Sequence, residues 1–234
     1  MSKYSLFTIL LILGSLALSA QAQYDVDNRL KLEVTPYVWM TTMNGDLTVN
    51  GESRKVNFTF EEFFKFSNLG LNGRVELKKY PWTVLFDYNY VDLLIDQTYT
   101  ELVLWEIGFG WHFSKGFEMI VGGRYFKTEI EYRENSQTIN QGKQSWFDPF
   151  IGGRTSWDLT RNLVFTARAD IGGFGVGSDF EWNILAGVGY RLSNITFTGF
   201  YRIWYANYEN GSGEDLFVYD MTISGPGLAM VLSF

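Results

Sequence analysis

Residues 105–113 carry the sequence Trp-Glu-Ile-Gly-Phe-Gly-Trp-His-Phe, in which every second side chain is large and apolar. Successive side chains of a β-strand point to opposite faces, so this alternation predicts a strand. With Val103, one face would carry Trp105, Ile107, Phe109, Trp111 and Phe113, while the other would carry Glu106, Gly108, Gly110 and His112. An apolar stripe of this length suits the roughly 9–11 residues that a tilted strand needs to cross a bilayer.

The same period of two recurs along the chain after residue 29 and predicts about ten strands, with eight to twelve possible. The predicted strands cover residues 30–43, 68–79, 82–95, 98–113, 117–132, 145–158, 162–174, 178–192, 194–208 and 217–234. Short turns at 79–81, 114–116, 159–161 and 193–194 contrast with longer connections at 44–67, 133–144 and 209–216. Outer-membrane barrels show this asymmetry, with short turns on the periplasmic side and longer loops outside.

Composition excludes several classes of protein. The chain has 24 Gly and 4 Pro, and 18% of its residues are aromatic, which favours strands joined by tight turns. It has no cysteine, which excludes a disulfide framework, a thiol nucleophile and a Cys-ligated metal site. A net charge of −7 argues against a nucleic-acid partner. No segment after the N-terminus is apolar enough for a membrane-spanning helix.

Residues 1–22 have the pattern of a secretory signal peptide. Lys3 precedes an apolar run from Leu6 to Leu18, and Ala20-Gln21-Ala22 has the small residues that signal peptidase accepts. A transmembrane anchor is the alternative, but the run is shorter than the roughly 20 residues that a spanning helix needs. We therefore expect a mature chain that starts at Gln23, with residues 23–234 forming one barrel domain.

The polarity of the two strand faces separates a membrane barrel from soluble folds. A lipocalin-type barrel is apolar inside and polar outside, whereas an outer-membrane barrel has the reverse arrangement. Trp82, Trp111, Tyr190 and Tyr205 lie near the ends of apolar stripes, where an aromatic girdle would meet the membrane interface. We therefore expect a closed antiparallel up-and-down transmembrane β-barrel. A β-sandwich that buries the apolar stripes is the alternative.

Phe234 ends an alternating segment in phase with Met230 and Leu232. It resembles the C-terminal aromatic signature that the barrel assembly machinery recognises. We expect that machinery and outer-membrane lipid to be the partners of the chain.

Several glycine-rich segments resemble a family of bacterial outer-membrane β-barrel proteins whose members are largely uncharacterised. They are Gly122-Gly123-Arg124-Tyr125, residues 148–154 (Asp-Pro-Phe-Ile-Gly-Gly-Arg), residues 170–179 (Asp-Ile-Gly-Gly-Phe-Gly-Val-Gly-Ser-Asp) and residues 186–191 (Ala-Gly-Val-Gly-Tyr-Arg). The resemblance runs along most of the mature chain. It implies a closed barrel in the outer membrane and supplies no substrate or catalytic residue.

If the polar faces point inward, acidic and basic side chains meet in the lumen. The predicted lumen network consists of Arg74, Glu76, Asp87, Glu106, Arg124, Asp148, Arg154, Arg168, Asp170, Glu181, Arg191 and Arg202. These charges could pair and plug a narrow barrel, because an unpaired buried charge costs several kcal/mol. Alternatively, they could line a thin, porin-like aqueous path. Side chains can fill the lumen of an eight-stranded barrel, and a barrel of ten strands is only slightly wider, which favours the plug.

The first long connection, at about 44–67, has its own pattern. Asn50-Gly51 is a strong two-residue hairpin turn between two short alternating segments, and we expect this hairpin to protrude. If it instead extended the barrel wall, the strand count would rise to twelve. Phenylalanines are concentrated here and form a candidate binding surface: Phe58, Phe60, Phe63, Phe64 and Phe66.

The sequence offers little for catalysis. His112 is the only histidine, and it lies at a predicted periplasmic turn beside Ser114 with no evident acid to orient its ring. Loop acids lack the spacing of an EF-hand, so we expect neither a metal nor another cofactor. We expect a non-enzymatic barrel with a narrow or plugged channel or a structural role. The alternatives are a surface binding or adhesion module acting through the first loop and, less favoured, an enzyme.

Overall fold

The computed structural model describes residues 29–62, 67–68, 72–95, 98–134 and 137–234. The predicted signal peptide at 1–22 lies outside these residues, as do Phe63, Phe64 and Phe66. No helix among the described residues is long and apolar enough to span a membrane, a criterion that does not address β-barrels.

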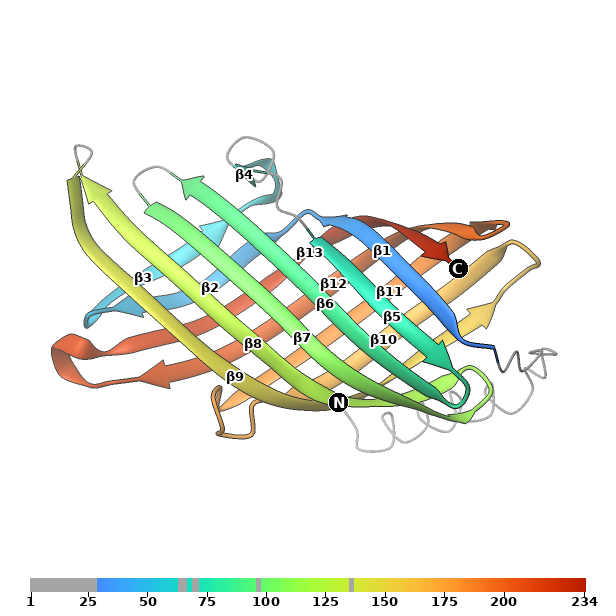
Figure 1. The fold of residues 1–234 in the computed structure, drawn as a ribbon. Coiled ribbons are helices and arrows are strands. Elements are labelled where there is room, and N and C mark those ends of the chain that lie inside the picture. The colour runs from blue at the N-terminus through green and yellow to red at the C-terminus, as the bar shows by residue number, and fades with distance from the viewer. Residues whose placement is uncertain (1–28, 63–66, 69–71, 96–97, 135–136) are drawn as a thin grey trace, which may run out of the picture.

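Ten long strands form one closed antiparallel barrel (Figure 1). They are β1 (Lys31–Trp39), β5 (Asn72–Lys79), β6 (Trp82–Ile95), β7 (Thr98–Ser114), β8 (Phe117–Glu134), β9 (Gln137–Asp158), β10 (Leu163–Gly172), β11 (Phe180–Leu192), β12 (Ile195–Asn210) and β13 (Phe217–Ser233). Each strand pairs with its neighbour in this order, and β1 pairs with β13 to close the barrel. The predicted β-barrel is confirmed, and the β-sandwich alternative is wrong because the sheet closes on itself.

The two ends of the barrel differ. The start of β1 and the C-terminus lie together at what we call the inner end, where Leu32 and Phe234 exchange backbone hydrogen bonds of 3.2 and 2.9 Å. The four short turns predicted at 79–81, 114–116, 159–161 and 193–194 are confirmed at this end. The longer hairpins, including that of β12 and β13, extend from the opposite, outer end (Figure 1).

The strands reach unequal heights at the outer end. β8 and β9 continue as one hairpin up to Glu134 and Gln137, so the loop predicted at 133–144 is largely strand. β10 and β11 are shorter and are joined by residues 173–179. The part of β9 near the outer end carries polar side chains on both faces. It therefore lacks the alternation of apolar and polar residues that predicts a strand.

The predicted hairpin at Asn50-Gly51 is present between β2 (Thr42–Val49) and β3 (Glu52–Phe58). Asn50 and Gly51 have φ values of 51° and 78°, as the favoured two-residue hairpin turn requires. The prediction that this hairpin protrudes freely is wrong. β2 pairs with β13 from Thr42 opposite Ser224 to Thr48 opposite Val218, so the hairpin extends the barrel wall at the outer end.

A single register explains this extension. β1 pairs with β13 up to Trp39 opposite Gly227, and β2 resumes in the same register at Thr42 opposite Ser224. The interruption lies opposite Pro226, whose backbone has no N–H to donate, although its carbonyl still accepts from Met40 N at 2.9 Å. A two-residue strand, β4 (Ser67–Asn68), pairs with β6 at the same end.

The predicted orientation of the strand faces is confirmed. Ile107 and Phe109 are 52% and 43% exposed on the barrel exterior, whereas Glu106 and Arg124 are 2% and 1% exposed inside. A water-soluble protein does not leave a continuous belt of such large apolar side chains exposed. This inside-out arrangement is the one that a bilayer requires.

Candidate functional site

A buried charge cluster, which we call the central network, crosses the lumen between β7, β8, β10 and β11. The Arg124 guanidinium donates to Glu106 at 3.0 and 3.1 Å, to Asp170 at 2.8 Å and to Glu181 at 2.6 Å. Arg168 donates to Asp170 at 2.7 Å and also to both oxygens of Glu106. Each of these side chains is almost fully buried, so two guanidinium groups hold three carboxylates that come from different walls of the barrel.

Neutral and aromatic groups complete the central network. Asn183 Nδ2 donates to Asp170 at 2.8 Å, and Asn183 Oδ1 accepts from Arg202 at 2.7 Å. The Phe150 ring lies 4.8 Å from the Arg124 guanidinium carbon, within cation–π range. Trp204 Nε1 donates to the second oxygen of Glu181 at 3.2 Å. These contacts satisfy groups that would be costly to bury without partners.

A second cluster, the inner network, fills the lumen closer to the inner end. Arg74 donates to Asp87 at 2.6 Å, and Arg154 bridges Glu76 at 2.8 Å to Glu118. Lys78 contacts Glu76 at 3.1 Å and Glu33 at 2.5 Å. The Tyr37 hydroxyl lies 2.5 Å from Asp87 and 2.7 Å from Asn89. The inner network therefore braces β1, β5, β6, β8 and β9 against one another.

The outer half of the interior has a different composition. Phe126 lies 4.3 Å from Trp146 and 5.1 Å from Trp204, measured between ring centroids. Trp146 stacks on Tyr208 at 4.1 Å with nearly parallel planes, and Tyr219 closes the group 5.2 Å from Phe126. We call these five rings the aromatic core. Leu47, Val49, Phe58, Leu102, Leu104, Ile130, Phe217, Met221 and Ile223 belong to the same buried cluster.

The apolar stripe changes face within single strands. On β7 the exterior is apolar from Phe113 to Trp105 and then carries Glu101, while the interior changes from Glu106 to Leu104 and Leu102. On β8 the interior changes at the same level, from Arg124 to Phe126. Trp105 and Tyr125 stack on the exterior at this level, with centroids 5.3 Å apart, as expected of an interfacial girdle.

Most residues of the predicted lumen network are brought together. Asp148 is buried but serves a separate purpose, because it accepts from the backbone N–H and the hydroxyl of Ser178, both at 2.6 Å, and so anchors the 173–179 loop. Arg191 departs from the prediction. Its side chain is 41% exposed at the inner rim, where it pairs with Asp158 at 3.0 Å. Since β11 ends at Leu192, Arg191 lies too near the barrel mouth to reach either network.

The charge-based prediction missed the uncharged members of the interior: Tyr37, Asn89, Phe150, Asn183 and Trp204. Asn183 lies two residues after Glu181, on the same face of β11, and Tyr37 has the same phase as Glu33 on β1. Strand parity alone would have identified them.

The predicted phenylalanine surface is reduced by the structure. Phe58 is 1% exposed and belongs to the buried cluster, so it is not available to a surface partner, and this part of the prediction is wrong. Its position at the end of β3, opposite Met43 on β2, turns its ring inward. Phe60 is 42% exposed at the start of a helical segment that Thr59 and Glu62 cap reciprocally.

His112 has an acidic neighbour that sequence analysis did not identify. Glu118 is its cross-strand partner on β8, with Glu118 Oε1 3.6 Å from His112 Nε2. The imidazole stacks on Tyr80 with centroids 5.9 Å apart. The carboxylate also pairs with Arg154, which ties His112 to the inner network. Among the described residues, no group of three or more His, Cys, Asp or Glu could hold a metal ion.

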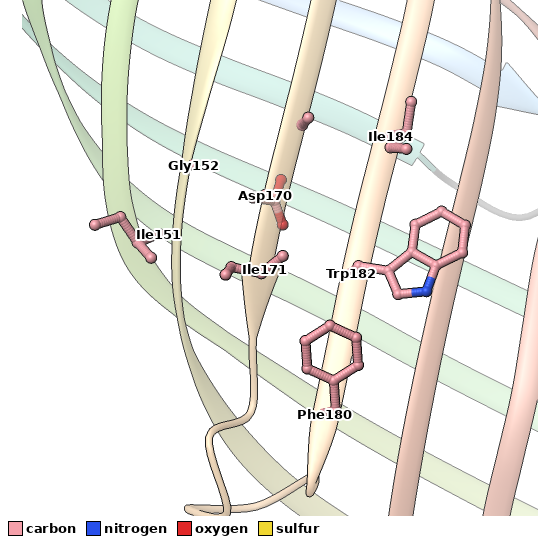
Figure 2. A pocket seen from close by; sticks show the side chains of 8 residues that line it. Ile151, Gly152, Asp170, Ile171, Phe180, Trp182 and Ile184 are labelled. Carbon is pink, nitrogen blue, oxygen red and sulfur yellow. The ribbon is translucent and has the colours of Figure 1, made fainter. Parts of the chain in front are cut away.

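A shallow apolar groove of about 450 Å³ lies on the exterior of β9, β10 and β11 (Figure 2). Ile151, Ile171, Phe180, Trp182 and Ile184 project around it, as Figure 2 shows. The groove is part of the apolar belt, so in a bilayer it faces lipid chains. It offers no convergent polar groups of the kind that binding sites use to orient a ligand.

Comparison with known proteins supports the fold. No family model matches the chain, and no curated protein sequence matches it significantly. The outer-membrane protease OmpT from Escherichia coli is structurally similar, with a TM-score of 0.50, 7% identity, and coverage of 92% of this chain and 99% of OmpT. The NalP autotransporter translocator domain from Neisseria meningitidis (TM-score 0.38, 11% identity, 98% of each chain) and Ail from Yersinia pestis (TM-score 0.35, 8% identity, 88% of this chain and 98% of Ail) show lower similarity.

The closed antiparallel barrel and its apolar exterior belt thus define an outer-membrane β-barrel protein. At 7% identity, the similarity to OmpT supports the fold and not a shared activity.

Proposed function

We propose that this protein is a non-enzymatic outer-membrane barrel with a closed lumen, and that it serves as a scaffold for its outer β-extension. The observation that supports closure is the presence of two seals in series. The central and inner networks fill one half of the lumen with paired charges, and the aromatic core fills the other half. An ion that crossed the barrel through the lumen would have to separate buried ion pairs and then pass a packed apolar layer.

The outer β-extension consists of the strand segments beyond the Trp105–Tyr125 girdle together with the β2–β3 hairpin. Its exterior carries ion pairs such as Lys127–Glu101 and Lys143–Glu129, both at 3.1 Å, which suit water and not lipid. The β2–β3 turn is joined to β9 on the opposite side of the extension, where Asn50 Nδ2 donates to Asn140 Oδ1 at 2.7 Å. We infer that the extension is a two-layered β-structure that lies outside the bilayer.

The non-enzymatic assignment is supported by how the ionisable groups are used. The buried carboxylates of the central network are held by guanidinium groups, and Glu118 beside His112 is held by Arg154. A general base must be free to take a proton from a bound substrate. Any surface-binding activity would then act through the outer β-extension, where Phe60 is exposed.

Single-channel recording in planar bilayers tests closure. We expect no stable conductance steps from the purified wild-type protein. We expect Arg124→Ala and Trp146→Ala to remain silent as well, because each leaves the other seal in place. Stable, reproducible steps from the wild-type barrel would refute the closed lumen.

A further inference from the structure

The inner turns of the barrel form a continuous hydrogen-bonded rim. Each turn accepts a backbone hydrogen bond from a strand of the neighbouring hairpin. These bonds are His112 N to Pro81 O (2.8 Å), Ser156 N to Gly116 O (3.2 Å), Arg191 N to Asn162 O (2.7 Å) and Ser233 N to Asn194 O (2.9 Å). The turns are therefore held at fixed positions around the inner mouth.

Three of these turns carry an exposed basic side chain: Lys79, Lys115 and Arg161. The structure shows no ion pair to any of the three among the residues it describes. The nearby acid Asp158 is already paired with Arg191 at 3.0 Å. The C-terminal carboxylate of Phe234 lies at the same end, beside β1. We call Lys79, Lys115 and Arg161 the basic rim.

The outer end has the opposite charge. Exposed or half-buried acids outnumber bases in the described part of the outer β-extension and its loops. The acids are Asp46, Glu52, Glu61, Glu62, Asp92, Glu101, Glu129, Glu131, Asp179, Glu209, Glu214, Asp215 and Asp220, and the bases are Arg54, Lys55, Lys127 and Lys143. Cations that served only solubility would show no such preference for one end.

Aromatic side chains place the basic rim at the level of lipid headgroups. Tyr80 follows Lys79 directly, and the exposed rings of Trp82 and Trp111 lie just inside the apolar belt. Tyr190 occupies the same level on β11. Tyr and Trp concentrate where the hydrocarbon meets the headgroups, so basic side chains in the adjoining turns reach the phosphates.

We propose that the basic rim binds the headgroups of anionic phospholipids in the leaflet that faces the inner end of the barrel. Successive turns are separated by two strands, which is roughly 10 Å along the rim. Each cation can therefore contact a separate headgroup. A Lys or Arg near an anionic surface raises the association constant by roughly fivefold at moderate salt. The turns are already held by backbone hydrogen bonds, so lipid binding does not have to order them.

Lipid selectivity in vesicles tests this proposal. The wild-type barrel is folded into phosphatidylcholine vesicles that contain increasing fractions of phosphatidylglycerol. Quenching of tryptophan fluorescence by brominated forms of either lipid then gives the association constant of phosphatidylglycerol relative to phosphatidylcholine. We expect a ratio of about five for the wild type at low salt. In high salt the ratio should approach one, because ions screen the exposed charges.

The triple variant Lys79→Gln, Lys115→Gln, Arg161→Gln should bring the ratio close to one at low salt. The matched control replaces three outer cations, Lys55→Gln, Lys127→Gln and Lys143→Gln, and so makes the same change in net charge. This control should retain the wild-type ratio, because Lys127 and Lys143 are already paired with Glu101 and Glu129. Both ends meet the same lipid in a symmetric vesicle, so the comparison is not biased by leaflet composition. A heat-modifiability gel verifies folding of each variant. An unchanged ratio in the rim variant, or an equal fall in the control, would overturn the proposal.

Discussion

Replacing Arg124 by methionine is expected to destabilise the folded barrel by about 3–5 kcal/mol, the usual cost of removing one partner from a buried ion pair. Arg124 is 1% exposed and donates to three carboxylates. In its absence Glu106 and Asp170 keep Arg168. Glu181 keeps only the Trp204 indole at 3.2 Å among the contacts of the described residues. Most of the loss therefore arises from the stranded charge of Glu181.

This reasoning predicts that a second substitution repairs the first. Glu181→Gln removes the stranded charge and keeps an oxygen that can accept from Trp204, so the double variant should recover at least half of the lost stability. Equilibrium urea unfolding in lipid vesicles, followed by tryptophan fluorescence, measures the free energy of unfolding of Arg124→Met, Glu181→Gln and the double variant. Lys143→Met breaks an exposed ion pair and serves as the control, with an expected loss below about 1 kcal/mol. The reasoning fails if Arg124→Met costs no more than this control, or if Glu181→Gln deepens the loss.

Three further substitutions, the last with a matched control, test other parts of the structure by the same unfolding assay. Trp146→Ala should cost about 3–5 kcal/mol and weaken the near-ultraviolet circular dichroism signal, because Trp146 packs against Phe126, Tyr208 and Tyr219; an intact signal would argue against the aromatic core. Phe109→Arg should cost about 2–4 kcal/mol, since it places a charge on the lipid-facing belt, and a neutral result would remove Phe109 from the bilayer. Gly122→Ala should cost about 1–3 kcal/mol because the new methyl group would lie 2.3 Å from the Ile107 carbonyl oxygen, whereas Gly199→Ala, with open space around it, should be close to neutral.

The ten-strand barrel could be predicted from sequence because alternation is strongest where the bilayer imposes it. Between Trp105 and Phe113 one face must be apolar and the other must not be, so the pattern on β7 is unambiguous. The charged members of the lumen networks could be predicted for the same reason, since Glu106, Arg124 and Arg168 lie in phase with glycines on the polar face. Their pairing could not, because contacts such as Arg124–Glu181 join strands far apart in the sequence.

The β2–β3 hairpin was harder to place because a local turn signal does not reveal which strand its outer edge meets. Asn50-Gly51 specifies a hairpin and nothing more. The hairpin joins the wall because β1 and β2 keep one register with β13 past Pro226, and that register is a long-range property. The inward turn of Phe58 follows from the same placement, so a surface function for this residue could not be excluded before the fold was known.

The exchange of apolar faces at the outer girdle shows why one rule could not describe the whole interior. Within the bilayer the solvent is lipid, so apolar side chains face outward and charges such as Arg124 pair inside. Above Trp105 and Tyr125 the solvent is water, so the same strands expose Glu101 and Lys127 and bury Leu104 and Phe126. Leu104 interrupts the alternation on β7 for this reason, and it marks the position where the strand leaves the membrane. The aromatic core in the outer half of the interior is therefore a consequence of strands that continue, unbroken, from lipid into water.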